Sequence, residues 1–200
     1  MKKNKMVLVI FLIVVFVLVI YFGMFNNKKV VQEAKKVDTI EKYNYNLYDN
    51  STKEYEKNFK SLADELSKES VDEEKYVELI SKLFIIDFYT LDNKLTNLNI
   101  GGVEFIHSEI VDNFKEKAKA TIYKYVENNM YGDRNQKLPV VKEVEITKIE
   151  QKAFIYDDNV DNKAFYVNAS WEYEKDLEYE TSKTLIFVHE DNKLSLVEMS

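Results

Sequence analysis

Hydrophobic residues along this chain follow three successive patterns: an unbroken apolar segment, then helical spacing, then strand alternation. The apolar segment covers residues 6–25 and contains no charged residue. About 20 helical residues rise ~30 Å, which is the thickness of the hydrocarbon core of a bilayer. The segment therefore predicts a single transmembrane helix that contacts the lipid bilayer through residues 6–25, behind a basic stub at residues 1–5.

A cleaved signal peptide is the main alternative for this segment. The apolar part of a signal peptide usually has ~7–15 residues and ends at a small-residue cleavage site. Residues 21–27 read YFGMFNN and offer no such site, and the chain has no cysteine to carry a lipid. An uncleaved anchor is the preferred interpretation, and a buried core helix would rarely be apolar on every side.

The orientation of the anchor is less sharply indicated, because lysines lie on both of its sides. Lys2, Lys3 and Lys5 precede it, whereas Lys28, Lys29, Lys35 and Lys36 follow it, so the lysine count alone leans toward the opposite orientation. The shortness of the stub and the charge of its α-amino group favour a cytoplasmic N-terminus. We therefore expect a single-pass protein of the cell membrane with its domain outside.

Residues 26–50 are expected to connect the anchor to the domain. The connector is polar, but it contains Tyr43, Tyr45, Leu47 and Tyr48. A helical or coil stalk with incidental tyrosines is the preferred interpretation. A short extended segment that packs on the domain, or one that mediates contact between copies, stays open.

Residues 51–200 form the expected extracytoplasmic domain, which begins with two helices. The first starts at Ser51, where Ser51 and Glu54 have capping-box spacing. The second starts at Ser70 and runs to about Leu91. Each helix has an apolar stripe at helical spacing, comprising Tyr55, Phe59, Leu62 and Leu66 in the first and Tyr76, Leu79, Ile80, Leu83, Phe84 and Phe88 in the second.

The next part of the chain predicts a loop, a short strand and a third helix. The loop ends at Gly101 and Gly102, which indicate a turn or bulge with unusual backbone angles. Residues 103–106 fit a short strand. The third helix is expected from Ser108 to about Gly132, with its apolar stripe at Ile110, Phe114, Ala118, Ile122 and Tyr125.

After Pro139 the alternation changes to the period of strands. Four strands are expected, within residues 141–156, 165–174, 181–189 and 194–199. Helices followed by a meander of strands predict an α+β fold, with about three helices on one face of a curved antiparallel sheet of about four strands.

Charge and composition narrow the classes of function. Lys2, Lys3 and Lys5 account for 3 of the 28 basic residues, so the rest of the chain carries 25 against 35 acidic residues, a net charge of −10. A surface this acidic repels phosphate backbones, so direct nucleic-acid binding is not expected. The absence of cysteine excludes disulfides, thiol catalysis and cysteine metal sites.

The order of elements behind one membrane helix resembles the cone-shaped fold of nuclear transport factor two. More narrowly, it is similar to the extracytoplasmic domain of the assembly subunit of type IV secretion and conjugation channels. The resemblance lies in the helix end FIIDFYT at residues 84–90, the helix at residues 108–125 and the strands at residues 140–199. It implies a self-associating structural subunit of the bacterial cell envelope without catalysis of its own.

Asp87 is the most interesting single residue, because it lies on the apolar stripe of the second helix. In a cone fold its carboxylate could face the pocket as a general base. The preferred interpretation is that it caps backbone or pairs with a lysine. His107 and His189 lack metal-site spacing and are expected to be surface or capping residues, and a pair of His107 with Asp87 would require proximity in space.

Three further patterns have a plain structural interpretation. Asp157, Asp158, Asn159 and Asp161 could chelate calcium, but they lack the EF-hand glycine and distal glutamate, which favours a hairpin loop. Gly101 and Gly102 do not form a phosphate-binding motif. Trp171 and the tyrosines around it are expected in the core rather than in a ligand cage.

Two hypotheses of function follow. The preferred one is a membrane-anchored assembly or interaction subunit, for which other envelope or channel proteins are the expected partners and a homo-oligomer stays open. The alternative is a cone-fold domain that binds or converts a small molecule. No catalytic, cofactor-binding or metal-binding residue is assigned, and no cofactor is expected.

Overall fold

The computed structural model describes residues 14–16, 31, 33–156 and 159–200. Of the predicted anchor, only residues 14–16 are among them, and these three are helical and exposed. The rest of the anchor and the stub lie outside the described residues. Among the helices of the described residues, none combines the length and the apolar character needed to cross a membrane.

A β-hairpin opens the domain, and it lies inside the region expected to be a connector. Strand β1 (Lys36–Ile40) pairs antiparallel with β2 (Tyr45–Tyr48). The side chains of Tyr43, Tyr45 and Leu47 are buried in the main core. The packed extended segment, and not the stalk, is therefore correct for residues 36–48, because the aromatic side chains gain burial that a stalk in water would not give them.

Two helices follow as predicted, with slightly later starts. Helix α2 (Lys53–Leu66) is capped by Thr52, whose side chain accepts a hydrogen bond from the amide of Tyr55. Helix α3 (Glu73–Tyr89) is capped by the carboxylate of Asp72, which accepts from two amides. The predicted apolar stripes of both helices are buried.

The segment between α3 and the sheet differs from the prediction. Residues expected to form a short strand form a 3-10 helix, η1 (Val103–Phe105), because Gly102 precedes it with a φ of 71° in the left-handed region. A second 3-10 turn, η2 (Ser108–Ile110), leads into α4 (Val111–Ala120).

Helix α4 ends well before the predicted end of the third helix. The backbone turns away at Thr121, and the hydroxyl of Tyr123 donates a hydrogen bond to the carbonyl of Phe88 at 2.8 Å. Tyr123 is thereby fully buried, whereas Tyr125, which was placed on the apolar stripe, is 73% exposed.

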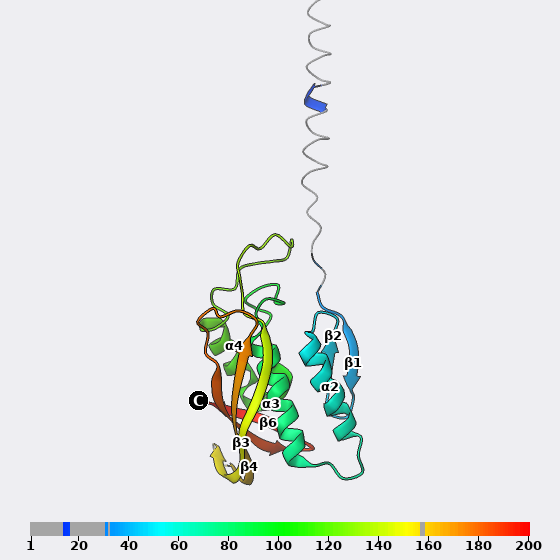
Figure 1. The fold of residues 1–200 in the computed structure, drawn as a ribbon, viewed down its shortest axis with the longest axis vertical. Coiled ribbons are helices and arrows are strands. Elements are labelled where there is room, and N and C mark those ends of the chain that lie inside the picture. Colours follow the sequence, from blue (N-terminus) through cyan, green and yellow to red (C-terminus); the bar gives the residue numbers. More distant parts are fainter. Residues whose placement is uncertain (1–13, 17–30, 32, 157–158) are drawn as a thin grey trace, which may run out of the picture.

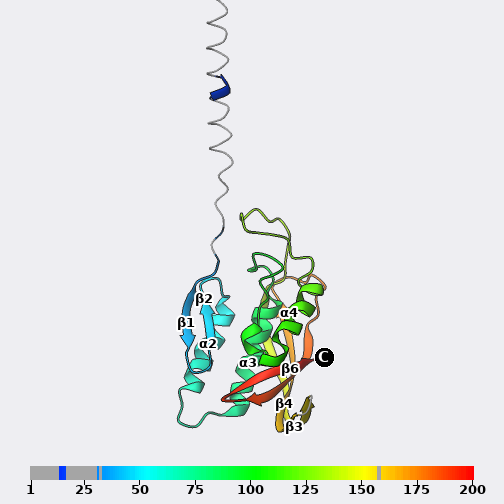
Figure 2. The same ribbon diagram turned by 180° about the vertical axis from the view of Figure 1, so that it is seen from behind.

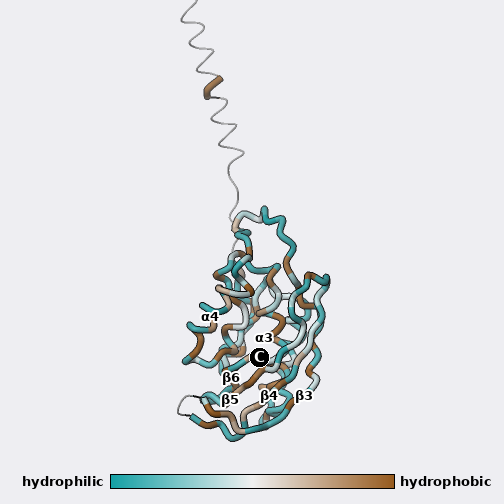
Figure 3. Tube along the Cα trace, turned by 90° about the vertical axis from the view of Figure 1, so that its left-hand side faces the viewer, coloured by the Kyte–Doolittle hydropathy of each residue, from teal (hydrophilic) through white to brown (hydrophobic). Residues whose placement is uncertain are grey.

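Four antiparallel strands form the main sheet, as predicted. Their order is β3 (Val141–Tyr156), β4 (Asn159–Tyr173), β5 (Ser182–Glu190) and β6 (Lys193–Met199). Side chains of β4 alternate between buried and solvent-facing positions from Phe165 to Trp171. Hydrophobic positions recur along these strands in the tube of Figure 3.

The sheet, α3 and the α2–hairpin unit form three layers (Figure 1). Helix α3 contacts β3 and β4 on one side and α2 on the other. The amide of Leu194, near the start of β6, donates to the hydroxyl of Tyr76 in α3 at 3.3 Å. The sheet therefore curves beneath α3, and its face toward α3 is filled by aromatic contacts such as that between Tyr89 and Trp171, whose ring centroids are 4.4 Å apart.

Strands β3 and β4 extend beyond the rest of the sheet as a two-stranded ribbon. Their pairing continues to Tyr156 opposite Asn159, whereas β4 pairs with β5 only from Phe165 to Ser170. This part, here called the ribbon (residues 152–156 and 159–164), lies at the opposite end of the domain from the loops at residues 93–102 and 128–135 (Figures 1 and 2).

Candidate functional site

A half-open pocket of about 600 Å³ lies outside the filled core, where the hairpin, the start of α2, the end of α3 and the loop at residues 93–104 meet. Its walls are rich in amide, hydroxyl and carboxylate groups. The polar lining residues include Asn44, Asn46, Tyr48, Asn50, Ser51, Thr52, Tyr55, Asp87, Asn93, Lys94, Asn99 and Glu104. Apolar side chains, including those of Ile86, Leu95, Ile100 and Val103, line the rest, so the pocket presents polar and apolar surface together.

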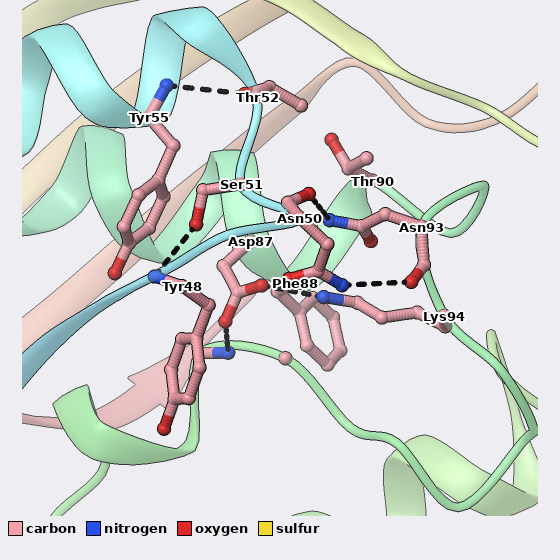
Figure 4. Close-up of polar contacts among 12 residues, drawn as sticks. Tyr48, Asn50, Ser51, Thr52, Tyr55, Asp87, Phe88, Thr90, Asn93 and Lys94 are labelled. Atoms are coloured by element: carbon pink, nitrogen blue, oxygen red, sulfur yellow. Dashed lines mark hydrogen bonds and ion pairs between the residues drawn. The ribbon is translucent and has the colours of Figure 1, made fainter. Parts of the chain in front are cut away.

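Asp87 projects from α3 into this pocket with both carboxylate oxygens engaged (Figure 4). One oxygen lies 2.5 Å from the ammonium of Lys94, which is itself buried. The other accepts a hydrogen bond from the amide of Gly102 at 2.6 Å. Asp87 therefore pairs with a lysine and binds backbone, as the preferred interpretation stated, and it also faces a pocket, as the alternative required.

The paired glycines make this arrangement possible. A Cβ at Gly101 would lie 2.2 Å from the carbonyl oxygen of Asp87, so only glycine fits against the backbone of α3. Gly102 has a positive φ of 71°, which confirms the unusual backbone angle predicted from the sequence. Together they bring the loop close enough for its amide to reach the carboxylate.

Glu104 is the second carboxylate of the pocket, and it joins three elements. From η1 it accepts hydrogen bonds from the side-chain amide of Asn46 in β2 at 2.9 Å and from the hydroxyl of Tyr55 in α2 at 3.0 Å. The backbone amide of Asn46 also donates to it, at 3.1 Å. These contacts hold the hairpin and α2 against the loop.

The electrostatics of Glu104 place its titration near neutral pH. Burial raises the pKa of Glu104 to about 7, and the negative charge of Asp87 acts in the same direction. The hydrogen bonds from Asn46 and Tyr55 oppose this rise because they favour the ionised form. Burial also raises the pKa of Tyr55 well above its ordinary value, so its hydroxyl keeps its proton and acts as a donor.

The sole arginine of the chain fixes the loop that carries Lys94. The guanidinium of Arg134 donates to the carbonyls of Asp92 at 2.6 Å and of Lys94 at 2.8 Å. Because the Lys94 backbone is held in this way, its ammonium is directed at Asp87 without a helix or strand to position it.

The two histidines lie outside the pocket. His107 is buried and caps η2, with its ring 5.5 Å from that of Tyr156 and its Nε2 3.8 Å from Glu190. The capping role is therefore right and the surface position wrong, because the ring packs beneath Tyr156. The structure does not bring His107 to Asp87, whose charged partner is Lys94.

His189 and the acidic loop meet through Asp161. The carboxylate of Asp161 contacts Nδ1 of His189 at 2.8 Å, and the other ring nitrogen lies 3.4 Å from Glu73. Residues 157 and 158, which belong to the calcium alternative, lie outside the described residues. In the described part of the chain, no group of three or more histidine, aspartate or glutamate side chains could hold a metal ion.

Glu104 was missed by the sequence analysis. It lies in a four-residue segment expected to be a strand, and its partners Asn46 and Tyr55 are 58 and 49 residues away. No local pattern links positions at such separations.

Comparisons of this chain with family models, curated proteins and solved structures found no match.

Proposed function

We propose that this chain is a membrane-anchored extracytoplasmic interaction subunit that acts through protein–protein contacts and carries out no catalysis of its own. The anchor is the uncharged apolar segment at residues 6–25. The domain presents the ribbon to partners in the cell envelope. A cone-like shape agrees with the four-stranded sheet that curves beneath α3, and the assignment to a secretion or conjugation channel rests on the resemblance alone.

The observation that carries this proposal is the opposite placement of the two ends of the domain. The loops at residues 93–102 and 128–135 lie at one end, where Val31 is joined to Met130 by a backbone hydrogen bond, and the ribbon projects at the other (Figures 1 and 2). An anchored chain of this shape holds the ribbon away from the bilayer, where envelope proteins can reach it.

The ribbon has a face suited to such a contact. Ile155 and Val160 are direct partners in the pairing of β3 with β4, and they are 71% and 55% exposed. The ring of Tyr156 turns to the other face and packs against His107. Two large apolar side chains thus lie side by side in water, where a partner protein would bury them.

Protease accessibility tests the topology. Protease added outside intact cells or protoplasts should digest residues 43–200. If that region is protected until the cells are lysed, the orientation is reversed and the extracytoplasmic part of the proposal is wrong.

A pair of charge substitutions tests the contact. In native membranes the parent chain should migrate in a complex larger than its own 23.7 kDa. The double variant Ile155→Asp with Val160→Asp should leave this complex while membrane abundance and folding stay normal. The control Lys60→Asp alters an exposed residue of α2 and should leave the complex intact. A complex that persists in the double variant contradicts the ribbon as the contact surface.

Ligand binding or catalysis in the pocket is the second candidate, favoured by the convergence of Asp87, Lys94 and Glu104. General acid–base groups contribute ~10²–10⁴-fold in rate. Under the interaction proposal, Asp87→Asn and His107→Ala should leave the biological role intact in a folded, membrane-bound chain. Loss of the role in Asp87→Asn, but not in the exposed control Asp112→Asn, would favour the pocket.

A further inference from the structure

We propose that the end of the domain nearest the anchor rests on the bilayer interface through a group of exposed apolar side chains. This group, here called the membrane-proximal patch, consists of Val31, Leu98, Met130 and Tyr131. The inference rests on the proposed function, because it requires the anchor at residues 6–25. It assigns a lipid partner to a surface separate from the ribbon.

The patch gathers large apolar side chains in water. Leu98 is 65% exposed, Tyr131 51%, Met130 39% and Val31 38%. Single exposed apolar residues are ordinary, but a group of them at one end of a domain indicates an interaction site. Tyrosine is suited to the boundary between headgroups and acyl chains, because its ring is apolar and its hydroxyl polar. Leucine and methionine are suited to insert their apolar side chains on the acyl side of that boundary.

The loops that carry the patch are built as one unit. The amide of Asn129 donates to the carbonyl of Leu95 at 2.7 Å, which ties the loop of Met130 to the loop of Leu98. Arg134 reinforces this connection through its two bonds to the carbonyls of Asp92 and Lys94. The patch is therefore held in place by specific contacts, and both loops lie at the same end of the domain (Figure 2).

The length of chain behind the anchor confines the patch to the neighbourhood of the membrane. The amide of Val31 donates to the carbonyl of Met130 at 2.6 Å. Six residues lead from Phe25 to Val31, and a fully extended chain covers at most ~3.6 Å per residue, or ~22 Å. The headgroup region of one leaflet is ~5–8 Å thick, so the patch starts within reach of the interface.

Charge at this end does not oppose the contact. Residues 121–138 carry three basic side chains and two acidic ones, whereas the whole chain has a net charge of −7. The ammonium of Lys124 lies 5.1 Å from the centre of the Tyr125 ring, and that ring is 73% exposed. Such a pair can place its ring at the interface and its charge among anionic headgroups.

The absence of cysteine makes a direct test simple. The full chain would be prepared as single-cysteine variants Leu98→Cys and Met130→Cys, with Ile155→Cys and Val160→Cys as matched controls on the ribbon. Each would carry an environment-sensitive fluorophore and be reconstituted into vesicles of phosphatidylcholine and phosphatidylglycerol. Flotation of the vesicles, quenching by headgroup spin-labelled lipid and quenching by aqueous iodide would be measured.

We expect all variants to float with the vesicles, which tests the anchor separately. Labels at Leu98 and Met130 should emit at shorter wavelength, be quenched several-fold more strongly by spin-labelled lipid than the ribbon labels, and be less open to iodide. Chains that float but whose patch labels match the ribbon labels overturn this inference and leave the proposed function standing. Chains that do not float overturn both. Patch labels shielded from iodide yet not quenched by lipid indicate a second copy or another protein on the patch, which also overturns the inference.

Discussion

Glu104 should make the stability of this domain depend on pH near neutrality. In the folded chain its pKa is about 7, above the ordinary value of 4.5, chiefly because of burial. Between these two values the folded state therefore binds more protons than the unfolded state. The free energy of unfolding should fall as pH rises from about 4.5 to about 7 and change little from this group above that range.

The size of the effect follows from the two pKa values. They differ by about 2.5 pH units, and each unit corresponds to about 1.4 kcal/mol, so Glu104 should lower the free energy of unfolding by about 3 kcal/mol across the range. Asp161 and Glu190 have lowered pKa values, so their contributions are lost only as pH falls below the ordinary range of carboxyl groups. The two effects thus occupy different parts of the pH scale.

Urea denaturation of a fragment of residues 33–200, followed from about pH 4.5 to about pH 8, measures this directly. Glu104→Gln keeps the size of the side chain and removes its titration, so the fall in stability should be reduced by about 3 kcal/mol. The control Glu69→Gln removes an exposed carboxylate in the turn after α2 and should keep the fall of the parent. An unchanged pH profile in Glu104→Gln would refute the reasoning, whatever the absolute stability of the variant.

Three further substitutions or truncations follow from the packing. Trp171→Ala removes a buried side chain and should cost ~3–5 kcal/mol, measured by circular dichroism because the chain has no other tryptophan. Gly101→Ala places a Cβ 2.2 Å from the carbonyl oxygen of Asp87 and should destabilise the fold by ~1–3 kcal/mol, and an unchanged melting temperature would contradict this contact. A fragment that begins at residue 51 should melt at a lower temperature than one that begins at residue 33, because it lacks the fully buried Tyr45 and the hairpin around it. Equal melting temperatures would show that the hairpin does not stabilise the domain.

The elements that could be predicted from the sequence are those whose burial follows one period. One face of α2 and one face of β4 are buried by neighbouring elements, as at Phe59 and Leu62 in the helix and at Val167 and Trp171 in the strand. Apolar residues therefore recur about every 3.6 residues in the helix and every 2 residues in the strand. The sheet order and the α+β class follow from consecutive strands joined by short turns. These parts of the prediction are confirmed by the structure.

The parts that could not be predicted depend on contacts between distant segments. The apolar spacing continues past Ala120 to Tyr125, but the helix stops because the hydroxyl of Tyr123 reaches the carbonyl of Phe88, 35 residues away. The hairpin around Tyr45 could not be predicted from local sequence either, because the ring of Tyr45 is buried against Tyr76 and Phe105, which are distant in the chain. A short aromatic segment gives no sign of which surface will cover it.

The candidate site contains one carboxylate that could be identified from the sequence, Asp87, and one that could not, Glu104. This difference decides which carboxylate to test. Asp87 could be identified from the stripe of α3, yet both of its oxygens are already engaged, by Lys94 and by the amide of Gly102. Glu104 changes charge near neutral pH and links β2, α2 and η1, so it is the group through which pocket and fold are coupled. If Glu104→Gln flattens the pH profile while the biological role survives, the pocket serves the architecture of the domain. If the role is lost in a variant that is stable and folded, the pocket carries a function that depends on the carboxyl group of Glu104.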